Sequence, residues 1–128
     1  MQESGSSSLK IKYVDDDKSM LNLAQLFFTR LPLFDLQVYS SPTEILNDEL
    51  SCDGFLLDVN MPEMNGLELF DELRTQQRWK ETPIAFLTGH TDPEALNQLS
   101  AKTPHILSKP FTPEQIDQFF RKVFKIEA

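Results

Sequence analysis

Five short apolar segments, each followed by a turn and a stretch of helical periodicity, constrain the fold of this chain more than any other feature. Apolar residues recur at helical spacing in all five of the stretches that follow. Such regular alternation predicts an α/β domain, in which a five-stranded parallel sheet carries helices on both faces. We expect the flavodoxin-like strand order 2-1-3-4-5. The expected strands cover residues 9–14, 36–39, 54–57, 83–87 and 105–108.

Polar residues with a capping function precede several of the expected helices. Asp17 is placed to cap the first helix. Ser41 can cap the second, with Pro42 as its first residue and Glu44 as the capping-box partner, and the apolar pattern of this helix continues to Leu50. The helix starts at residues 92–94 and 112–115 repeat this arrangement of a cap followed by proline. Each cap marks the start of a helix, so the preceding strand is expected to end before it.

The length of 128 residues indicates one domain with a core of its own. Residues 1–8 are polar and rich in serine, so we expect a flexible tail there and the folded domain over residues 9–128. The chain ends soon after its last expected helix. It is therefore expected to be either a single-domain protein or an excerpt of a larger one.

The net charge of −8 excludes some classes of function. Direct binding to nucleic acid or to an anionic membrane needs a basic face, which this composition disfavours. The apolar runs are too short to span a bilayer, and the amino terminus lacks an apolar signal core. Cys52 is the single cysteine, so no internal disulfide can form. Together these features favour a cytoplasmic protein.

Polar residues follow four of the expected strands at the point where each strand ends. They are Asp15 and Asp16, Asp58, Thr88, and Lys109. Because the carboxyl ends of parallel strands share one edge of the sheet, we expect these side chains to converge. Three neighbouring carboxylates repel one another and need a cation, and oxygen ligands of high charge suit Mg²⁺. A lysine and a hydroxyl beside them suit an anion, so the set predicts phosphoryl transfer with an aspartate as the nucleophile.

Each of these elements has a plainer interpretation when taken alone. A pair of aspartates before a helix is more often a cap with surface charge, and a threonine at a strand end usually has no further task. A lysine before a proline, such as Lys109, is usually solvated. The conjunction of all of them at four strand ends is what favours a functional site.

These residues lie in four motifs that resemble the receiver domains of two-component response regulators. The resemblance extends over about residues 10–126, with the motifs in the same order and at similar spacing. The motifs are YVDDD at residues 13–17, LDVNMPEMNG at 57–66, LTG at 87–89 and SKPF at 108–111. The resemblance implies that Asp58 accepts a phosphoryl group from a phosphohistidine on a sensor histidine kinase or a histidine phosphotransfer protein.

The resemblance also implies roles for the surrounding residues. Asp16 would be a direct Mg²⁺ ligand, Asp15 would act largely through water, and Asn60 would supply its backbone carbonyl. Thr88 would hydrogen-bond a phosphoryl oxygen, and Lys109 would pair first with Asp58 and then with the phosphoryl group. The peptide bond between Lys109 and Pro110 would be cis. The protein would be a signalling switch that binds a downstream effector or a second copy of itself, either alone or as part of a hybrid kinase or larger regulator.

Two positions depart from the family pattern or modify it. Ile106 stands three residues before the lysine, where relatives usually carry Tyr or Phe, so the aromatic side chain that responds to phosphorylation in many relatives is absent. His90 follows Thr88 by two residues, where family members tune the access of water to the phosphoryl group; an exposed loop histidine is the plainer interpretation.

Two other functions stay open beside the switch. A phosphatase of the haloacid dehalogenase type also uses a Mg²⁺-bound aspartate, but it needs a second acid two residues later, where this chain has Asn60. A pseudo-receiver would bind partners without ever being phosphorylated, and the intact acidic set argues against it. We therefore expect no enzymatic activity beyond the protein's own phosphorylation and dephosphorylation.

Overall fold

All five strands of the sheet run in the same direction. The computed structural model describes residues 8–89 and 92–126, and in it the strand order is β2-β1-β3-β4-β5 with every neighbouring pair parallel. The predicted flavodoxin-like order is thereby confirmed. The strands are β1 (Leu9–Val14), β2 (Phe34–Tyr39), β3 (Gly54–Asp58), β4 (Ile84–Thr88) and β5 (Ile106–Ser108).

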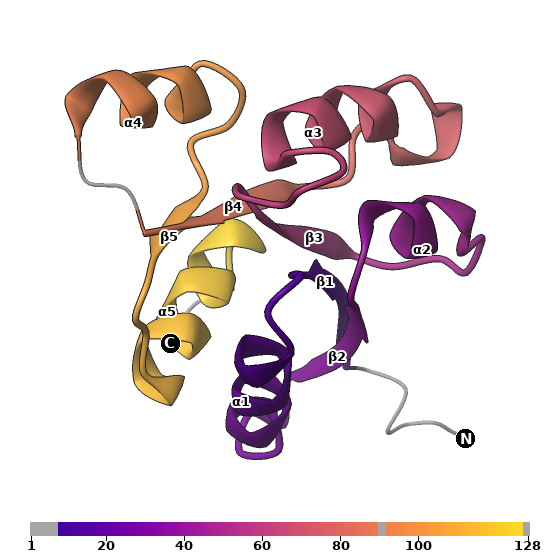
Figure 1. Cartoon of the computed structure of the whole chain (residues 1–128). Helices are drawn as coiled ribbons and strands as arrows, with labels where there is room; N and C mark the ends of the chain where they lie inside the picture. The colour runs from indigo at the N-terminus through magenta and orange to yellow at the C-terminus, as the bar shows by residue number, and fades with distance from the viewer. Residues whose placement is uncertain (1–7, 90–91, 127–128) are drawn as a thin grey trace.

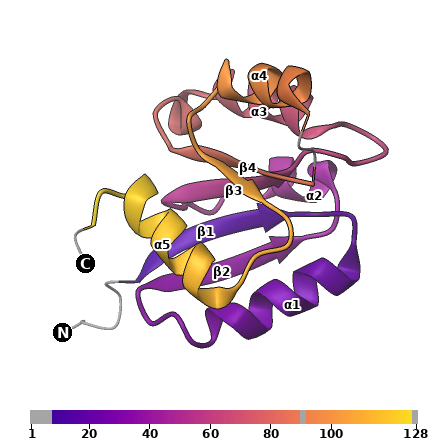
Figure 2. The ribbon, with the colours of Figure 1, turned by 90° about the vertical axis from the view of Figure 1, so that its left-hand side faces the viewer.

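Helices cover both faces of this sheet, as the alternation predicted (Figures 1 and 2). Helices α1 and α5 pack on one face, and α2, α3 and α4 pack on the other. A 3₁₀ turn, η2, follows α3. The bounds are α1 (Lys18–Phe28), α2 (Pro42–Asn47), α3 (Gly66–Arg74), η2 (Gln77–Trp79), α4 (Pro93–Ser100) and α5 (Pro113–Val123).

Strand β3 lies at the centre of the sheet and is buried along its whole length. Its side chains alternate between two cores, because successive residues of a strand point to opposite faces. Leu56 packs in the core under α1 and α5, whereas Phe55 and Leu57 pack in the core under α2, α3 and α4. Asp58 is the last residue of this strand and lies at the edge of the sheet. Its carboxylate is therefore buried.

Side-chain caps start the helices at the expected residues, with some differences in detail. Asp17 accepts a hydrogen bond from the N–H of Ser19 at the start of α1. The Asn65 side chain forms a full capping box with Glu68 at the start of α3, where the sequence had indicated only a turn. The carboxylate of Glu44 accepts from the N–H of Ser40, one residue before the Ser41 cap, where the sequence had predicted Ser41 itself as the partner.

Helix α2 is also shorter than the apolar pattern predicted. It ends at Asn47, and Asp48 adopts an extended conformation while its Oδ1 accepts the N–H of Leu50. This side-chain turn competes with the helical hydrogen bonds and stops the helix. Leu50 therefore lies beyond the helix and is 64% exposed.

Two sequence expectations, on membrane spans and on the amino-terminal tail, can be compared with the structure. Among the described residues, no helix has the length and apolar character that crossing a membrane requires.

Of the tail expected over residues 1–8, only Ser8 lies within the described residues, and its hydroxyl contacts the carbonyl of Pro32 at 3.4 Å. The division into tail and domain stays a prediction.

Candidate functional site

The sheet topology brings together residues from four of its strand ends. Strand β3 lies between β1 and β4, with β5 beyond β4, so the residues that end or follow these strands share one edge. Asp58 is the last residue of β3 and Thr88 the last of β4, while Asp15 follows β1 and Lys109 follows β5. Three of these side chains are buried: Asp15 is 0% exposed, Asp58 3% and Thr88 1%. The convergence expected from the sequence is therefore present in the fold.

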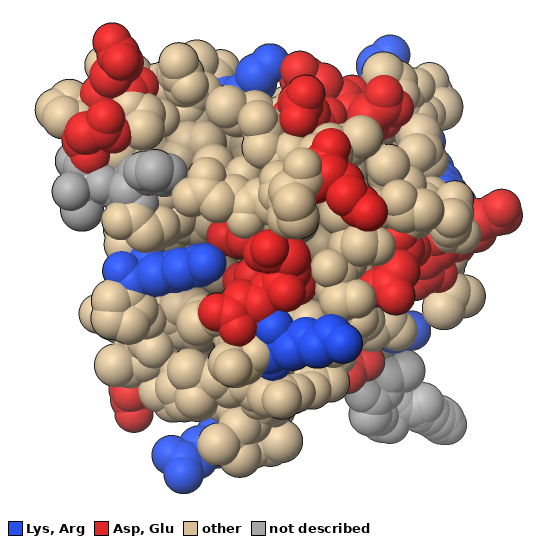
Figure 3. Space-filling view, viewed as in Figure 1, with Lys and Arg blue, Asp and Glu red and all other residues tan. Residues whose placement is uncertain are grey.

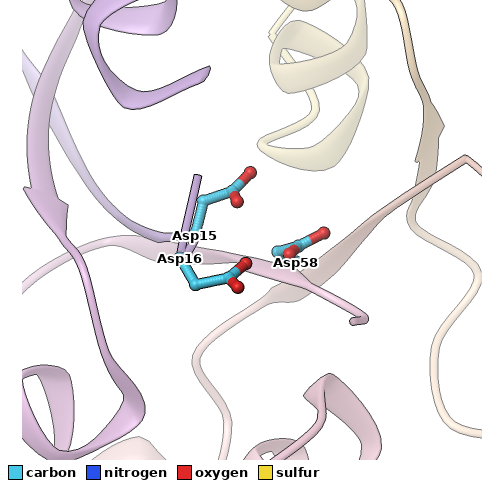
Figure 4. Close-up of side chains that lie close together, drawn as sticks. All are labelled: Asp15, Asp16 and Asp58. Carbon is cyan, nitrogen blue, oxygen red and sulfur yellow. The ribbon is translucent and has the colours of Figure 1, made fainter. Parts of the chain in front are cut away.

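Three carboxylates form the centre of this edge. Asp15, Asp16 and Asp58 each offer one oxygen, and these oxygens lie within 4.8 Å of one another. Figure 4 shows Asp15 and Asp16 on the segment that follows β1 and Asp58 on β3. Acidic side chains gather near the middle of this face, with basic side chains beside them (Figure 3). Oxygen ligands with this much negative charge suit a hard divalent cation.

Lys109 contacts two of the three carboxylates. Its Nζ lies 3.0 Å from Oδ1 of Asp58 and 3.6 Å from Oδ2 of Asp15, and its side chain is 27% exposed. Burial opposes the charged form of Lys109, but the hydrogen bond to Asp58 and the attraction of both carboxylates outweigh it and raise the pKa of the lysine. The ammonium group is therefore a fixed positive charge at the site.

The backbone around Lys109 fixes where this charge lies. The N–H of Lys109 donates to the carbonyl of Thr88 at 2.8 Å, which ties the end of β5 to the end of β4. The Lys109–Pro110 peptide bond is cis, as the resemblance implied.

The surroundings of Asp58 make its carboxylate harder to ionise than that of a solvent-exposed aspartate. Burial raises the pKa of Asp58 to about 6, the hydrogen bond from Lys109 opposes this rise, and the negative charge of Asp15 adds to it. Burial removes the water that would stabilise the ionised carboxylate, so a cation bound beside Asp58 would stabilise that ionised form.

Asp15 has two hydrogen-bond donors of its own. The hydroxyl of Tyr13 donates to Oδ2 at 2.6 Å, and the backbone N–H of Asp17 donates to Oδ1 at 2.9 Å. Burial, followed by this hydrogen bond, raises the pKa of Tyr13. Sequence reasoning did not include Tyr13 in the site, although residues two apart in an extended chain share a face and that period could have indicated it.

The loop after Asp58 is fixed by backbone contacts. The N–H of Val59 donates to the carbonyl of Leu87 at 3.1 Å, and the N–H of Gly66 donates to the carbonyl of Val59 at 2.9 Å. A Cβ on Gly66 would lie 2.8 Å from the carbonyl oxygen of Asp58, which is closer than side chains allow. Glycine is therefore required at residue 66 so that α3 can start directly against the acceptor strand.

The remaining predicted residues lie around this centre. Asn60 is exposed in the loop two residues after Asp58, and Asp16 is exposed at the rim of the carboxylate cluster. Ile106 is half-buried and packs on the core under α2, α3 and α4. His90 lies outside the described residues, so its predicted influence on water access stays a prediction.

Comparisons with known proteins agree with this architecture. Residues 11–121 match the family model of the response regulator receiver domain. The chain is 33% identical over 119 residues to response regulator protein TmoT of Ectopseudomonas mendocina; this match covers 91% of the chain but only 53% of TmoT, about half of the relative's length.

Two solved structures show the same fold. Chemotaxis protein CheY4 of Vibrio cholerae gives a TM-score of 0.81 at 28% identity, over 91% of this chain and 98% of that one. The receiver domain of sensor histidine kinase PA1611 from Pseudomonas aeruginosa, solved with a magnesium ion in its active-site cleft, gives 0.82 at 19% identity, over 92% of this chain and 98% of that one. With its strand order, its acidic edge and a family match over most of its length, the chain belongs to the response regulator receiver domain family.

Proposed function

We propose that this protein is a phospho-acceptor switch, in which Asp58 receives a phosphoryl group from a phosphohistidine on a sensor histidine kinase or a histidine phosphotransfer protein. One observation carries the proposal: a buried carboxylate at the end of the central strand lies 3.0 Å from a lysine ammonium and beside two further carboxylates. With a divalent cation bound to the carboxylates, that cation and the lysine would neutralise charge on both sides of a phosphoryl group.

The acidic cluster fits Mg²⁺ as the required cofactor. Asp16 would be a direct ligand, Asp15 would act largely through water, and Asn60 would supply its backbone carbonyl. The oxygens of the three carboxylates are close enough to share one ion, and Mg²⁺ keeps several waters when it binds to few carboxylates. A magnesium ion is reported in the active-site cleft of the PA1611 receiver domain, which supports Mg²⁺ as the cofactor. When bound, the ion would neutralise the negative charge that builds up on the phosphoryl oxygens.

The positions of the protein groups support a single in-line transfer step. An oxygen of Asp58 attacks phosphorus in line with the leaving imidazole. The phosphorus–nitrogen bond breaks, the electron pair stays on the imidazole nitrogen, and that nitrogen takes a proton from solvent. Lys109, which pairs with Asp58 before transfer, then pairs with a phosphoryl oxygen. The hydroxyl of Thr88, at the end of the neighbouring strand, donates to another.

Phosphorylation would bias a two-state equilibrium in the last part of the fold. Thr88 would move toward the phosphoryl group, and α4, β5 and α5 would shift with it. Ile106 occupies the position from which relatives usually read this movement with an aromatic ring, so its half-buried aliphatic side chain would transmit the change through packing under α4. The altered surface would bind a downstream effector protein or a second copy of the domain.

Intact-protein mass spectrometry tests this function. The protein is incubated with Mg²⁺ and acetyl phosphate, in parallel with Asp58→Asn. We expect one phosphoryl group on the wild type and none on the variant. Absence of any gain, or a gain that survives Asp58→Asn, would contradict the proposal.

The same samples address the phosphatase alternative. A phosphatase needs a general acid near residue 60, and the side chain of Asn60 cannot give a proton to a leaving group. We expect no sustained hydrolysis of an aryl phosphomonoester. Turnover that is lost in Asp58→Ala would favour the phosphatase instead.

A further inference from the structure

We infer that Tyr13 is a positioning residue for the acidic site, because its hydroxyl holds the Asp15 carboxylate in the orientation that a divalent cation requires. The inference rests on the proposed Mg²⁺ site and adds a residue to it. Tyr13 does not belong to the set of strand-end residues that define that site. It lies two residues earlier, within β1.

The contact between the two side chains is short and excluded from water. The Tyr13 hydroxyl lies 2.6 Å from Oδ2 of Asp15, and both residues are 0% exposed. A hydrogen bond to an ionised acceptor is about twice as strong as a neutral one, and it is not weakened by competing water in a buried site.

The tyrosine ring itself has little freedom to move. Tyr13 lies in the middle of the sheet, where its backbone pairs with Val38 of β2 and with Leu56 of β3. Its ring belongs to the core under α1 and α5 and is the largest fully buried side chain among the described residues. The Tyr13 hydroxyl therefore has a fixed position, and its hydrogen bond fixes the orientation of the Asp15 carboxylate.

The hydroxyl also competes with Lys109 for the Asp15 carboxylate. Oδ2 of Asp15 faces both the Tyr13 hydroxyl at 2.6 Å and the Lys109 ammonium at 3.6 Å. Oδ1 is already bonded to the N–H of Asp17. Lys109 also contacts Oδ2, so without the hydroxyl it would be drawn from Asp58 toward Asp15. Tyr13 thus keeps Asp15 directed at the cluster and leaves Lys109 with the acceptor.

The chain contains a matched control for this contact. Its second tyrosine, Tyr39, also donates its hydroxyl to an aspartate, Asp48. Asp48 follows the end of α2 and is not among the three clustered carboxylates. The variants Tyr13→Phe and Tyr39→Phe therefore remove the same kind of bond, one at the site and one away from it.

The first test measures metal binding without any phosphodonor. Mn²⁺, an oxygen-seeking stand-in for Mg²⁺, is titrated into each protein, and free Mn²⁺ is followed by electron paramagnetic resonance. Loss of a residue that orients a ligand typically weakens metal binding about 10- to 100-fold. We expect weakening of at least about tenfold in Tyr13→Phe and no change in Tyr39→Phe. Equal binding by Tyr13→Phe and wild type would overturn the inference, whereas no binding by the wild type would overturn the proposed metal site itself.

A second measurement follows the wild-type protein and does not depend on the folding of Tyr13→Phe. The protein is labelled with 3-fluorotyrosine, which gives one fluorine resonance for each of its two tyrosines, and the remaining signal of Tyr39→Phe assigns Tyr13. Addition of Mg²⁺ is expected to shift the Tyr13 resonance and to leave that of Tyr39 in place. A Tyr13 resonance that does not respond to Mg²⁺ at concentrations that saturate the protein would contradict the inference.

Discussion

The ammonium of Lys109 lies 3.0 Å from the carboxylate of Asp58, although 51 residues separate them in the chain. This contact exists because β5 and β3 end at the same edge of the sheet and Lys109 reaches across the end of β4. In Lys109→Met the acceptor loses its cation, and phosphorylation by acetyl phosphate is expected to slow at least about tenfold, since one charge-stabilising group is removed from the transition state. The measurement is an intact-mass time course.

Lys102→Met is the control for that experiment. Lys102 pairs with Asp71 on the surface, away from the acidic cluster, so its loss should leave the rate unchanged. Equal rates in Lys109→Met and wild type would show that the contact has no part in the transfer.

Asp58→Asn is expected to stabilise the metal-free protein at neutral pH. The folded protein raises the pKa of Asp58 from 3.8 to about 6, so it disfavours the ionised carboxylate. The stabilisation that protonated Asp58 provides is fully present below about pH 4 and is lost as the pH rises through about 6. Asparagine does not ionise, so in EDTA at pH 7 the variant should exceed the wild type by roughly 1–3 kcal/mol in free energy of unfolding.

Urea denaturation at pH 4 and pH 7 checks the direction of this stability difference and the pH range over which it develops. The advantage of Asp58→Asn should be much smaller at pH 4, where the wild-type residue is protonated in the folded state and partly protonated in the unfolded state. A variant less stable than the wild type at pH 7 would contradict the burial argument.

Mg²⁺ is expected to raise the stability of the wild type, because it binds the folded carboxylate cluster and not the unfolded chain. At a concentration a hundred times the dissociation constant, one site contributes about 2.7 kcal/mol. Asp16→Asn removes a proposed direct ligand and should abolish most of the shift in melting temperature. Asp35→Asn, on β2 and outside the cluster, should retain it. Loss of the shift in both variants, or in neither, would argue against a site at Asp16.

Gly66→Ala tests the close packing of α3 against the acceptor strand. The added Cβ would lie 2.8 Å from the carbonyl oxygen of Asp58 and 3.0 Å from the Cα of Val59, and backbone atoms cannot move aside cheaply. We expect a loss of about 1–3 kcal/mol in unfolding free energy. Gly89→Ala is the matched control, because a Cβ there meets no described atom within 4 Å. Similar losses in the two variants would mean that the cost comes from the backbone freedom of glycine and not from the contact.

Lys12→Met tests a buried cation outside the site. The Lys12 side chain is 0% exposed, and its Nζ lies 2.5 Å from the carbonyl of Leu50, 3.6 Å from the Asp48 carboxylate and 4.9 Å from the centre of the Trp79 ring. Methionine fills similar space but removes the hydrogen bond to the Leu50 carbonyl and the positive charge beside Asp48, so we expect a loss of about 2 kcal/mol by urea denaturation. Lys10→Met, at an exposed position of the same strand, should change little.

The convergence of Asp15, Asp58 and Lys109 was predictable because it depends on the direction of the strands. Once the alternation of strands and helices indicated a parallel sheet, residues at the carboxyl ends of neighbouring strands had to meet. The start of α1 was equally predictable, since Asp17 caps it through a local contact. Both inferences need only the order of residues along the chain.

Contacts that depend on side-chain reach were not predictable in this way. Tyr13 was recognised as a strand residue, but its bond to Asp15 depends on the rotamer of a ring buried in the core. Lys12 alternates with apolar neighbours, which is typical of an exposed strand face, yet α2 and η2 cover that face and bury it. Trp79 is surrounded by polar residues in the sequence, and only the fold places its ring edge-on against Phe55.

The acceptor role of Asp58 is the central claim, and its most direct test is to locate the phosphoryl group. After incubation with Mg²⁺ and acetyl phosphate, the acyl phosphate is reduced with borohydride, which converts a phosphorylated aspartate to homoserine. Tandem mass spectrometry of the digested protein then identifies the modified residue. The account predicts homoserine at position 58 and at no other aspartate. Modification at Asp15 or Asp16, or unmodified Asp58 in protein that carries a phosphoryl group, would contradict it.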